Sequence, residues 1–115
     1  MKGKKKELRI ISPNGHLGFA PTKEESFYIG ARTKPDYYVS DSGSCDIGPA
    51  PLGADKSAGL YERQKHDLEL MLLASREQGV PMIIGSAGDT GSNSMVDRYV
   101  QIIKDLAKKH NLPKF

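Results

Sequence analysis

The chain has 115 residues, of which 37% are hydrophobic and 27% are charged. This length fits one domain and excludes two, since domains cluster near roughly 100 to 150 residues. No apolar run approaches the ~20 residues of a membrane span, which favours a soluble globular protein. The single cysteine, Cys45, excludes an internal disulfide framework, and residues 1–6 lack the apolar stretch of a secretory signal. We therefore expect a cytoplasmic protein.

The net charge of +3 is concentrated at the start of the chain. Four positive charges come from Lys2, Lys4, Lys5 and Lys6, so the rest of the chain carries a net charge of −1. A short lysine tail is typically solvated, and the alternative of a phosphate-binding arm lacks the interleaved aromatic residues of a nucleic-acid platform. The sequence predicts a basic tail over residues 1–6, followed by a single domain over residues 7–115. It predicts neither a nucleic-acid nor a membrane partner.

The first predicted elements are a strand and a helix. Residues 8–12 form a short β-branched run that ends at residues 13–15 (PNG), which is typical of a strand followed by a turn. Thr22 and Glu25 have the spacing of a capping box, which predicts a helix that stops before Pro35. Its apolar residues are Phe27, Ile29 and Ala31.

A second strand and helix are predicted on either side of a long loop. Residues 36–40 fit a strand, and residues 41–57 contain two prolines and three glycines, which favours a loop. Residues 60–78 have helical periodicity, and Gly79 is placed to end that helix in the left-handed conformation. The periodic residues are Tyr61, Leu68, Met71, Leu72 and Ser75.

The last two predicted elements are a buried strand and an amphipathic helix. Residues 80–84 are continuously apolar, which predicts a strand buried on both faces, with Pro81 near its start. The helix that follows is expected to bury one face, formed by Val96, Tyr99, Val100, Ile103, Leu106, Ala107 and His110.

Three strands that alternate with three helices predict a β-α-β-α-β-α order and a parallel sheet with right-handed crossovers. The expected architecture is a three-layer α/β domain, equivalent to half of a Rossmann-like or flavodoxin-like fold. Three strands are fewer than the usual ~5 to 6, so the sheet is expected to be incomplete. The chain is then either the N-terminal segment of a larger domain or a subunit whose sheet edge another chain covers.

Ligands of open parallel sheets bind beyond the carboxyl ends of the strands, where loops meet helix N-termini. This rule selects residues 12–16, 41–46 and 85–93. The predicted catalytic residues in these loops are His16, Asp41 and Asp89. The predicted substrate-binding residues are Asn14, Gly15, Ser42, Gly43, Ser44, Gly85, Ser86, Gly88, Thr90 and Gly91.

The glycines of the third loop recur every three residues, so a ligand can approach the backbone closely. This spacing is not the dinucleotide fingerprint. It favours an anion-accepting turn, with a tight strand-to-helix turn as the alternative. Asp89 would repel an anion, and it suits a ligand hydroxyl, a cation or the cap of the following helix.

The acidic and nucleophilic side chains of these loops do not identify a cofactor, which stays unknown, although a divalent cation is possible. Asp41, Asp46 and Asp89 are oxygen donors that a divalent cation could use, although their spacing matches no metal motif. Cys45 is either a nucleophile or simply a small side chain. His16 is a candidate acid or base, or an ordinary loop residue, whereas His66 and His110 are expected to be structural.

Five motifs occur in a characteristic order: residues 12–19 (SPNGHLGF), 41–44 (DSGS), 46–49 (DIGP), 51–53 (PLG) and 84–91 (IGSAGDTG). In this order they resemble the N-terminal region of the acyclic terpene utilisation (AtuA-like) family, over about residues 8–115. The resemblance implies small-molecule catabolism, with carboxylates or acyl thioesters as substrates. Family members are several times longer, so the chain resembles their first segment only.

The leading hypothesis is a subunit or N-terminal segment of a catabolic enzyme that binds a small carboxylate or acyl-CoA at the strand ends. Lyase or hydratase chemistry would use His16 or Asp41 for proton transfer, and residues 85–92 would hold the anionic group. The alternative is a non-catalytic partner that completes the sheet of another protein. Either hypothesis predicts a homo-oligomer or a heteromer with a second subunit.

Overall fold

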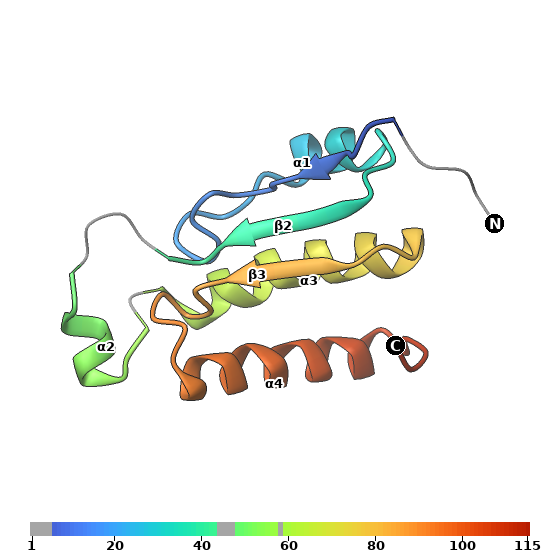
Figure 1. Cartoon of the computed structure of the whole chain (residues 1–115). Helices are drawn as coiled ribbons and strands as arrows, with labels where there is room; N and C mark the ends of the chain where they lie inside the picture. The colour runs from blue at the N-terminus through green and yellow to red at the C-terminus, as the bar shows by residue number, and fades with distance from the viewer. Residues whose placement is uncertain (1–5, 44–47, 58) are drawn as a thin grey trace.

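The computed structural model describes residues 6–43, 48–57 and 59–115. Strands and helices alternate along the chain apart from two consecutive helices after the second strand, which confirms the predicted α/β class (Figure 1). In chain order the elements are β1 (Ile10–Ile11), α1 (Glu24–Ala31), β2 (Tyr37–Asp41), α2 (Ala50–Ala54), α3 (Tyr61–Gln78), β3 (Met82–Gly85) and α4 (Asn93–Lys109). Within the described residues, no helix combines the length and apolarity needed to cross a membrane.

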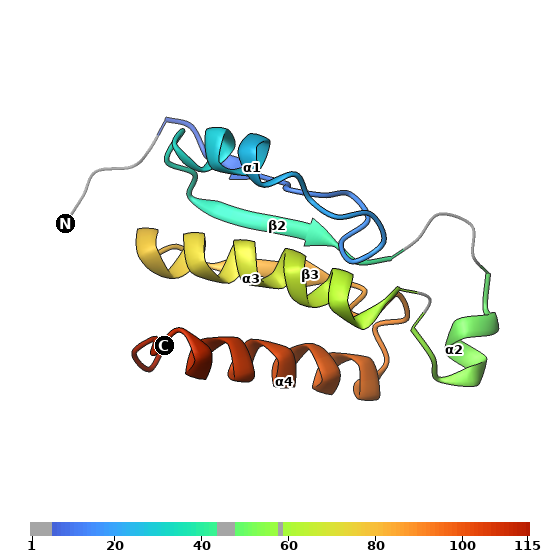
Figure 2. The ribbon, with the colours of Figure 1, turned by 180° about the vertical axis from the view of Figure 1, so that it is seen from behind.

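The sheet is parallel, as predicted, and its strand order is β1-β2-β3. Both crossovers step in the same direction, and right-handed crossovers then place α1 and α3 on the same face. The two helices lie behind the strands in Figure 1 and in front of them in Figure 2. In both views α4 runs beside α3, beyond the β3 edge of the sheet.

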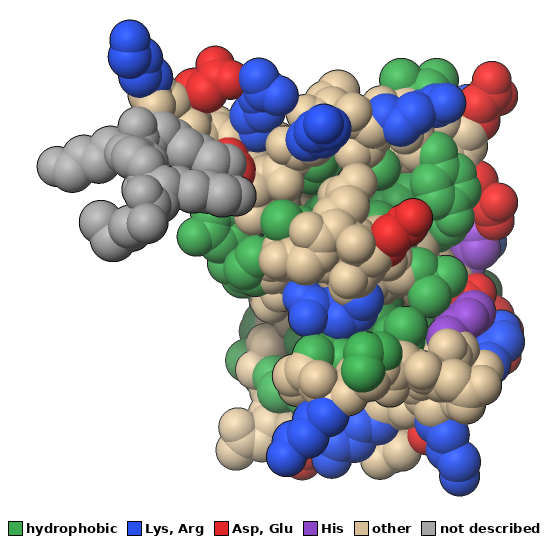
Figure 3. All heavy atoms as spheres, turned by 90° about the vertical axis from the view of Figure 1, so that its right-hand side faces the viewer, with side chains coloured by type: hydrophobic (Ala, Val, Ile, Leu, Met, Phe, Trp, Pro, Cys, Tyr) green, Lys and Arg blue, Asp and Glu red, His purple; other side chains and the backbone are tan. Residues whose placement is uncertain are grey.

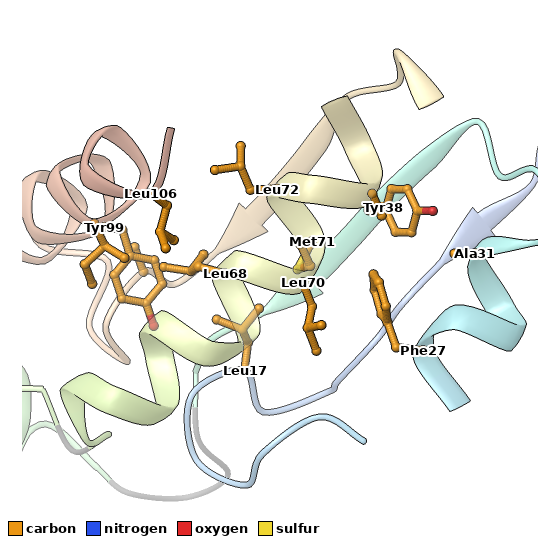
Figure 4. Packing of buried hydrophobic residues seen from close by; sticks show 13 residues of the cluster. Leu17, Phe27, Ala31, Tyr38, Leu68, Leu70, Met71, Leu72, Tyr99 and Leu106 are labelled. Carbon is orange, nitrogen blue, oxygen red and sulfur yellow. The ribbon is translucent and has the colours of Figure 1, made fainter. Parts of the chain in front are cut away.

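The hydrophobic core lies between the sheet and these helices. Tyr38 of β2 is fully buried and packs against Phe27 of α1, with 5.8 Å between ring centroids. Leu68 from α3 reaches toward Tyr99 from α4, so the core continues from the sheet into the contact between these helices (Figure 4). The other members of the buried cluster are Leu17, Ala31, Leu70, Met71, Leu72, Ala74, Ala87, Ile102 and Leu106.

The opposite face of the sheet carries exposed apolar side chains. Ile10 is 54% exposed and Ile83 is 52% exposed, whereas the intervening Val39 is half-buried. The prediction that residues 80–84 form a strand buried on both faces is therefore wrong: β3 alternates between half-buried and exposed residues. The reason is the one-sided placement of α1 and α3, which cover only the other face.

Two local predictions are also wrong. The segment 41–57 is not a loop throughout, because it contains α2, which has Pro51 in its first turn and ends at Asp55 with φ 52°. Thr22 does not cap α1, because the helix begins at Glu24, Lys23 holds the N-cap position and no side chain caps the first turn. The backbone N–H of Thr22 instead donates to the Asp67 carboxylate at 2.9 Å. Gly79, by contrast, ends α3 with φ 67°, as predicted.

The buried face of α4 is rotated from the predicted one. The residues that are buried are Met95, Tyr99, Ile102 and Leu106, whereas Val96 and Val100 are each 43% exposed. The difference follows from the position of α4, which packs against α3 and leaves one flank of its apolar arc uncovered. His110 is half-buried, and its Nε2 lies 3.0 Å from a carboxylate oxygen of Glu69.

Candidate ligand site at the carboxyl ends of the strands

The three predicted loops meet at one edge of the sheet because all three strands are parallel. The first loop lies against β2, since the N–H of Leu17 donates to the carbonyl of Asp41 at 2.9 Å. The second and third loops are joined where the N–H of Ser42 donates to the carbonyl of Gly85 at 2.8 Å. The edge is therefore a connected surface of loop backbone.

A buried carboxylate holds the first loop in place. Asp67 of α3 is 1% exposed, and it accepts hydrogen bonds from the N–H groups of Gly18 and Thr22 at 3.1 and 2.9 Å. The side-chain amide of Asn14 donates to the same carboxylate at 3.3 Å, and His66 Nδ1 lies 3.0 Å from it. Buried charges require such partners, so Asp67 acts as the anchor of this loop.

Asn14 therefore points inward. Its Nδ2 also donates to the carbonyl of Ala20 at 2.7 Å, and its Oδ1 accepts from the N–H of His16 at 2.8 Å. These bonds shape the turn that carries His16. A substrate-binding role for Asn14 stays a prediction.

A chain of hydrogen bonds connects the three loops through α4. The N–H of Gly88 donates to the Tyr99 hydroxyl, which bonds to the hydroxyl of Ser42, and Ser42 donates to the carbonyl of Leu17 at 2.8 Å. Ser42 is fully buried, so its hydroxyl faces the interior. Burial raises the pKa of Tyr99 above its ordinary value, so the phenol stays protonated and can donate.

Asp41 and Ser86 face each other across Gly43. The N–H of Gly43 donates to Asp41 Oδ1 at 2.7 Å. A Cβ atom at Gly43 would lie 3.1 Å from that oxygen and 3.2 Å from Ser86 Cβ. Two predicted site residues are thus brought together on the exposed side of this edge, and glycine between them leaves both accessible.

The third loop has an unusual backbone. Ser86 and Asp89 have φ values of 51° and 83°, which are uncommon for residues with a side chain, and Gly88 and Gly91 are also positive at 65°. Gly88 must be glycine for packing as well, because a Cβ there would lie 2.8 Å from Met95. The loop is therefore held in a conformation that local preference disfavours.

An exposed carboxylate from the chain itself lies at the N-terminus of α4. Ser92 caps this helix by accepting from the N–H of Met95 at 3.3 Å, and its hydroxyl donates to Asp55 Oδ1 at 3.1 Å. Ser94 donates to the same oxygen. Asp55, at the end of α2, thus occupies the position where the sequence predicted a ligand anion, and Asp89 is not the cap.

The predicted catalytic residues all lie on loops of this edge. His16 and Asp41 are exposed and Asp89 is half-buried. Gly15 faces open space, because a Cβ atom there would have no neighbour within 4 Å, whereas a Cβ atom at Gly85 would lie 4.0 Å from Asp41 Oδ1. Thr90 orders the loop, since its Oγ1 accepts from the N–H of Ser92 at 3.1 Å.

Some predicted residues lie outside the described chain, namely Ser44, Cys45 and Asp46. Across residues 6–43, 48–57 and 59–115, no cluster of three or more His, Cys, Asp or Glu side chains is arranged to hold a metal ion. The combination of Asp41, Asp46 and Asp89 thus stays a prediction from the sequence.

Sequence reasoning missed the residues that organise this edge, above all Asp67, Tyr99 and Asp55. Asp67 lies within a helical run of mixed charge, and nothing local marks it as buried. The periodicity places Tyr99 in the core through its ring, but its hydroxyl partner is 57 residues away. A signal existed only for Ser92, whose position before an amphipathic helix is typical of an N-cap.

The fold and this edge define an α/β protein with a polar loop surface at the carboxyl ends of a parallel sheet. No family model, curated protein or solved structure matches the chain. The resemblance to the AtuA-like family therefore stays a prediction that depends on the motifs alone.

Proposed function

We propose that the chain is a subunit or N-terminal segment of a larger catabolic enzyme, in which further protein covers the open face of the sheet. The observation that carries this proposal is the exposure of Ile10 and Ile83, at 54% and 52%, on one face. Leu8 is 61% exposed nearby. Parallel sheets are ordinarily covered on both faces, so the covering protein would complete a three-layer, Rossmann-like arrangement.

The space-filling view supports this reading of the surface. Figure 3 shows hydrophobic side chains in green along its left margin, which is the side of the sheet that faces the viewer in Figure 1. Several exposed apolar side chains on one face are typical of a place where another protein binds. The partner is either a second copy of the chain or a second subunit.

Light scattering of Ile83→Lys tests the covered face. We expect the unaltered chain to associate at micromolar concentration and the variant to associate at least tenfold more weakly. Ile29→Lys is the matched control, because Ile29 is 56% exposed but lies on α1. A cooperatively unfolding species that stays at 12.6 kDa at every concentration would contradict the proposal.

The second part of the proposal concerns the ligand, for which we suggest a small carboxylate or acyl-CoA at the carboxyl ends of the strands. The positive φ values of Ser86 and Asp89 support it, because backbone strain of this kind concentrates at functional sites. The facing pair of Asp41 and Ser86 adds exposed polar groups. In lyase or hydratase chemistry, His16 or Asp41 would transfer the proton.

Asp55 gives this hypothesis a sharp test. A ligand anion at the N-terminus of α4 would compete with the Asp55 carboxylate that Ser92 and Ser94 contact. Asp55→Asn should therefore strengthen binding a few-fold, whereas Asp89→Asn should weaken it if the Asp89 carboxylate binds a ligand hydroxyl or a cation. Asp105→Asn, on the exposed side of α4, serves as the control.

Thermal shift with short carboxylates and acyl-CoAs, with and without a chelator, provides the measurement. A stabilising shift that responds to both substitutions supports the enzyme. If no ligand shifts the unfolding temperature while the chain still associates, the result supports the alternative hypothesis, in which the chain is a non-catalytic partner that completes the sheet of another protein. The single cysteine and the net charge of −1 beyond the tail support a cytoplasmic setting without nucleic acid.

A further inference from the structure

The flank of α4 that α3 leaves uncovered carries a regular apolar stripe. It consists of Val96, Val100, Ile103 and Ala107, and hereafter it is called the α4 stripe. Val96 and Val100 are each 43% exposed, and Ile103 and Ala107 are half-buried. The spacing of four, three and four residues is the heptad spacing of a helix that packs against another helix.

The stripe has charged residues along one side only. Asp97 follows the first stripe residue and Lys104 follows the third, so each occupies the same position of consecutive heptads, and both are exposed. Lys104 has no ion-pair partner among the described residues. On the other side of the stripe lie Tyr99 and Leu106, which belong to the chain's own core.

This arrangement favours a second copy in antiparallel orientation. In a two-fold dimer of antiparallel helices, the same flank of each helix faces itself. Asp97 of one copy then meets Lys104 of the other, and the pair occurs twice. Flanking charges of this kind set helix orientation, and a parallel pair would place Asp97 against the buried flank instead.

A pocket beside the stripe adds contact surface. It has a volume of about 390 Å³ and lies between the C-terminal half of α4 and residues 112–115. Lys104 and Lys114 are among the residues that line it, together with the apolar Leu112, Pro113 and Phe115. Antiparallel pairing brings the partner's N-terminal half to this pocket, so its Val96 would enter an apolar wall and its Asp97 would face two lysines.

We propose that the α4 stripe is a homodimer interface in which two α4 helices pack antiparallel, with reciprocal Asp97–Lys104 ion pairs. The stripe shares no residue with the open face of the sheet described above, so the inference goes beyond the proposed function. The stripe is shorter than a standard interface, which buries about 800 Å² per partner. We therefore expect a dissociation constant in the range of about 1 to 100 μM.

The first experiment is sedimentation equilibrium of the whole chain from about 1 to 200 μM, carried out in an Ile83→Lys background to remove association through the sheet face. A monomer–dimer equilibrium is expected. Val100→Glu should weaken it at least tenfold, and Ile29→Glu, an equivalent change on α1, should not. Circular dichroism melts confirm folding, and Val100→Ala is a milder variant should Val100→Glu unfold the chain.

The second experiment tests orientation by charge exchange. Asp97→Lys and Lys104→Glu should each weaken the homodimer about tenfold, because like charges then meet. An equimolar mixture of the two variants should restore dimerisation, since both ion pairs re-form between unlike copies.

A chain that stays monomeric, or a dimer whose stability does not change with Val100→Glu, overturns the interface. A dimer sensitive to Val100→Glu but indifferent to the charge changes overturns the antiparallel orientation. Because the Ile83→Lys background removes association through the sheet face, each of these outcomes can be interpreted even if the sheet-face proposal is wrong.

Discussion

The carboxylate of Asp67 shows how a single buried residue shapes the candidate site. It accepts hydrogen bonds from the backbone N–H groups of Thr22 and Gly18, which lie 45 and 49 positions earlier in the sequence. Because the side chain is 1% exposed, water cannot replace these bonds. The position of the loop that carries His16 therefore depends on a helix residue outside the loop.

We expect Asp67→Asn to lower the free energy of unfolding by about 2 to 3 kcal/mol, because the amide removes the charge and turns a donor toward buried N–H groups. Urea unfolding measures the loss. Asp105→Asn is the control, since that carboxyl is exposed and bonds to Gln101 only among the described residues. Equal stability of the two variants would show that Asp67 is not an anchor.

Glu69 links α3 to the end of α4. The hydrogen bond from His110, with a further one from Lys109, lowers the pKa of the Glu69 carboxyl against the opposing effect of partial burial. A depressed pKa in the folded protein means that the carboxylate contributes stability above its unfolded pKa, near about 4.3. That contribution is lost as the pH falls through the folded pKa.

Glu69→Gln should therefore reduce stability at pH 7 by up to about 1 kcal/mol, since Lys109 is exposed and both His110 and Glu69 are only half-buried. The difference from the unaltered protein should shrink as the pH falls below about 4. Thermal melts across pH 3 to 7 provide the measurement. A constant difference over that range would show that the ionised form of Glu69 is not what stabilises the helix contact.

At the scale of elements, the start of α4 depends on three polar side chains from two segments. Ser92 caps the helix, and the hydroxyls of Ser92 and Ser94 both donate to Asp55, the residue that ends α2. The negative carboxylate at a helix N-terminus is favourable for the helix dipole. This contact ties the short helix α2, which the sequence did not predict, to the body of the domain.

Ser92→Ala should destabilise the protein by about 1 kcal/mol, because the first turn of α4 loses its cap. Chemical denaturation measures the change. Ser26→Ala on α1 is the control, as Ser26 is exposed and its hydroxyl bonds to the nearby carbonyl of Lys23. A loss of stability no larger than that of the control would mean that water satisfies the backbone N–H groups in the first turn of α4 as well as Ser92 does.

At the scale of the whole molecule, the chain of hydrogen bonds through Tyr99 joins the ends of all three strands. It runs from Gly88 in the third loop to Leu17 in the first, by way of Ser42 after β2. Helix α4 is thus connected to the loop edge as well as to α3. We therefore expect this connection to hold the loops of the candidate site together.

Tyr99→Phe should keep the packing but leave the N–H of Gly88 without its phenol partner and the buried hydroxyl of Ser42 with only its bond to the Leu17 carbonyl, at a cost of about 1 to 3 kcal/mol. Hydrogen exchange should quicken at the amide of Gly88 more than in β2. Tyr28→Phe is the control, because that ring is 44% exposed. Unchanged exchange at Gly88 would show that the loops are held independently.

The sequence by itself determined the alternation of the three strands with the helices α1, α3 and α4, the parallel sheet and the end of α3 at Gly79. These features arise from patterns within a few residues, such as helical periodicity and the left-handed preference of glycine. It also placed His16, Asp41 and Asp89 at one edge, because strand direction alone decides which loops meet there.

Only the tertiary structure decided which groups organise that edge and which surfaces remain open. The partners of Asp67 and Tyr99 are about half the chain away, and no local pattern records such pairings. The exposure of Ile83 and Val100 depends on where α1, α3 and α4 pack. An apolar residue in the sequence shows that burial is favourable, whereas the placement of neighbouring elements determines whether anything buries it.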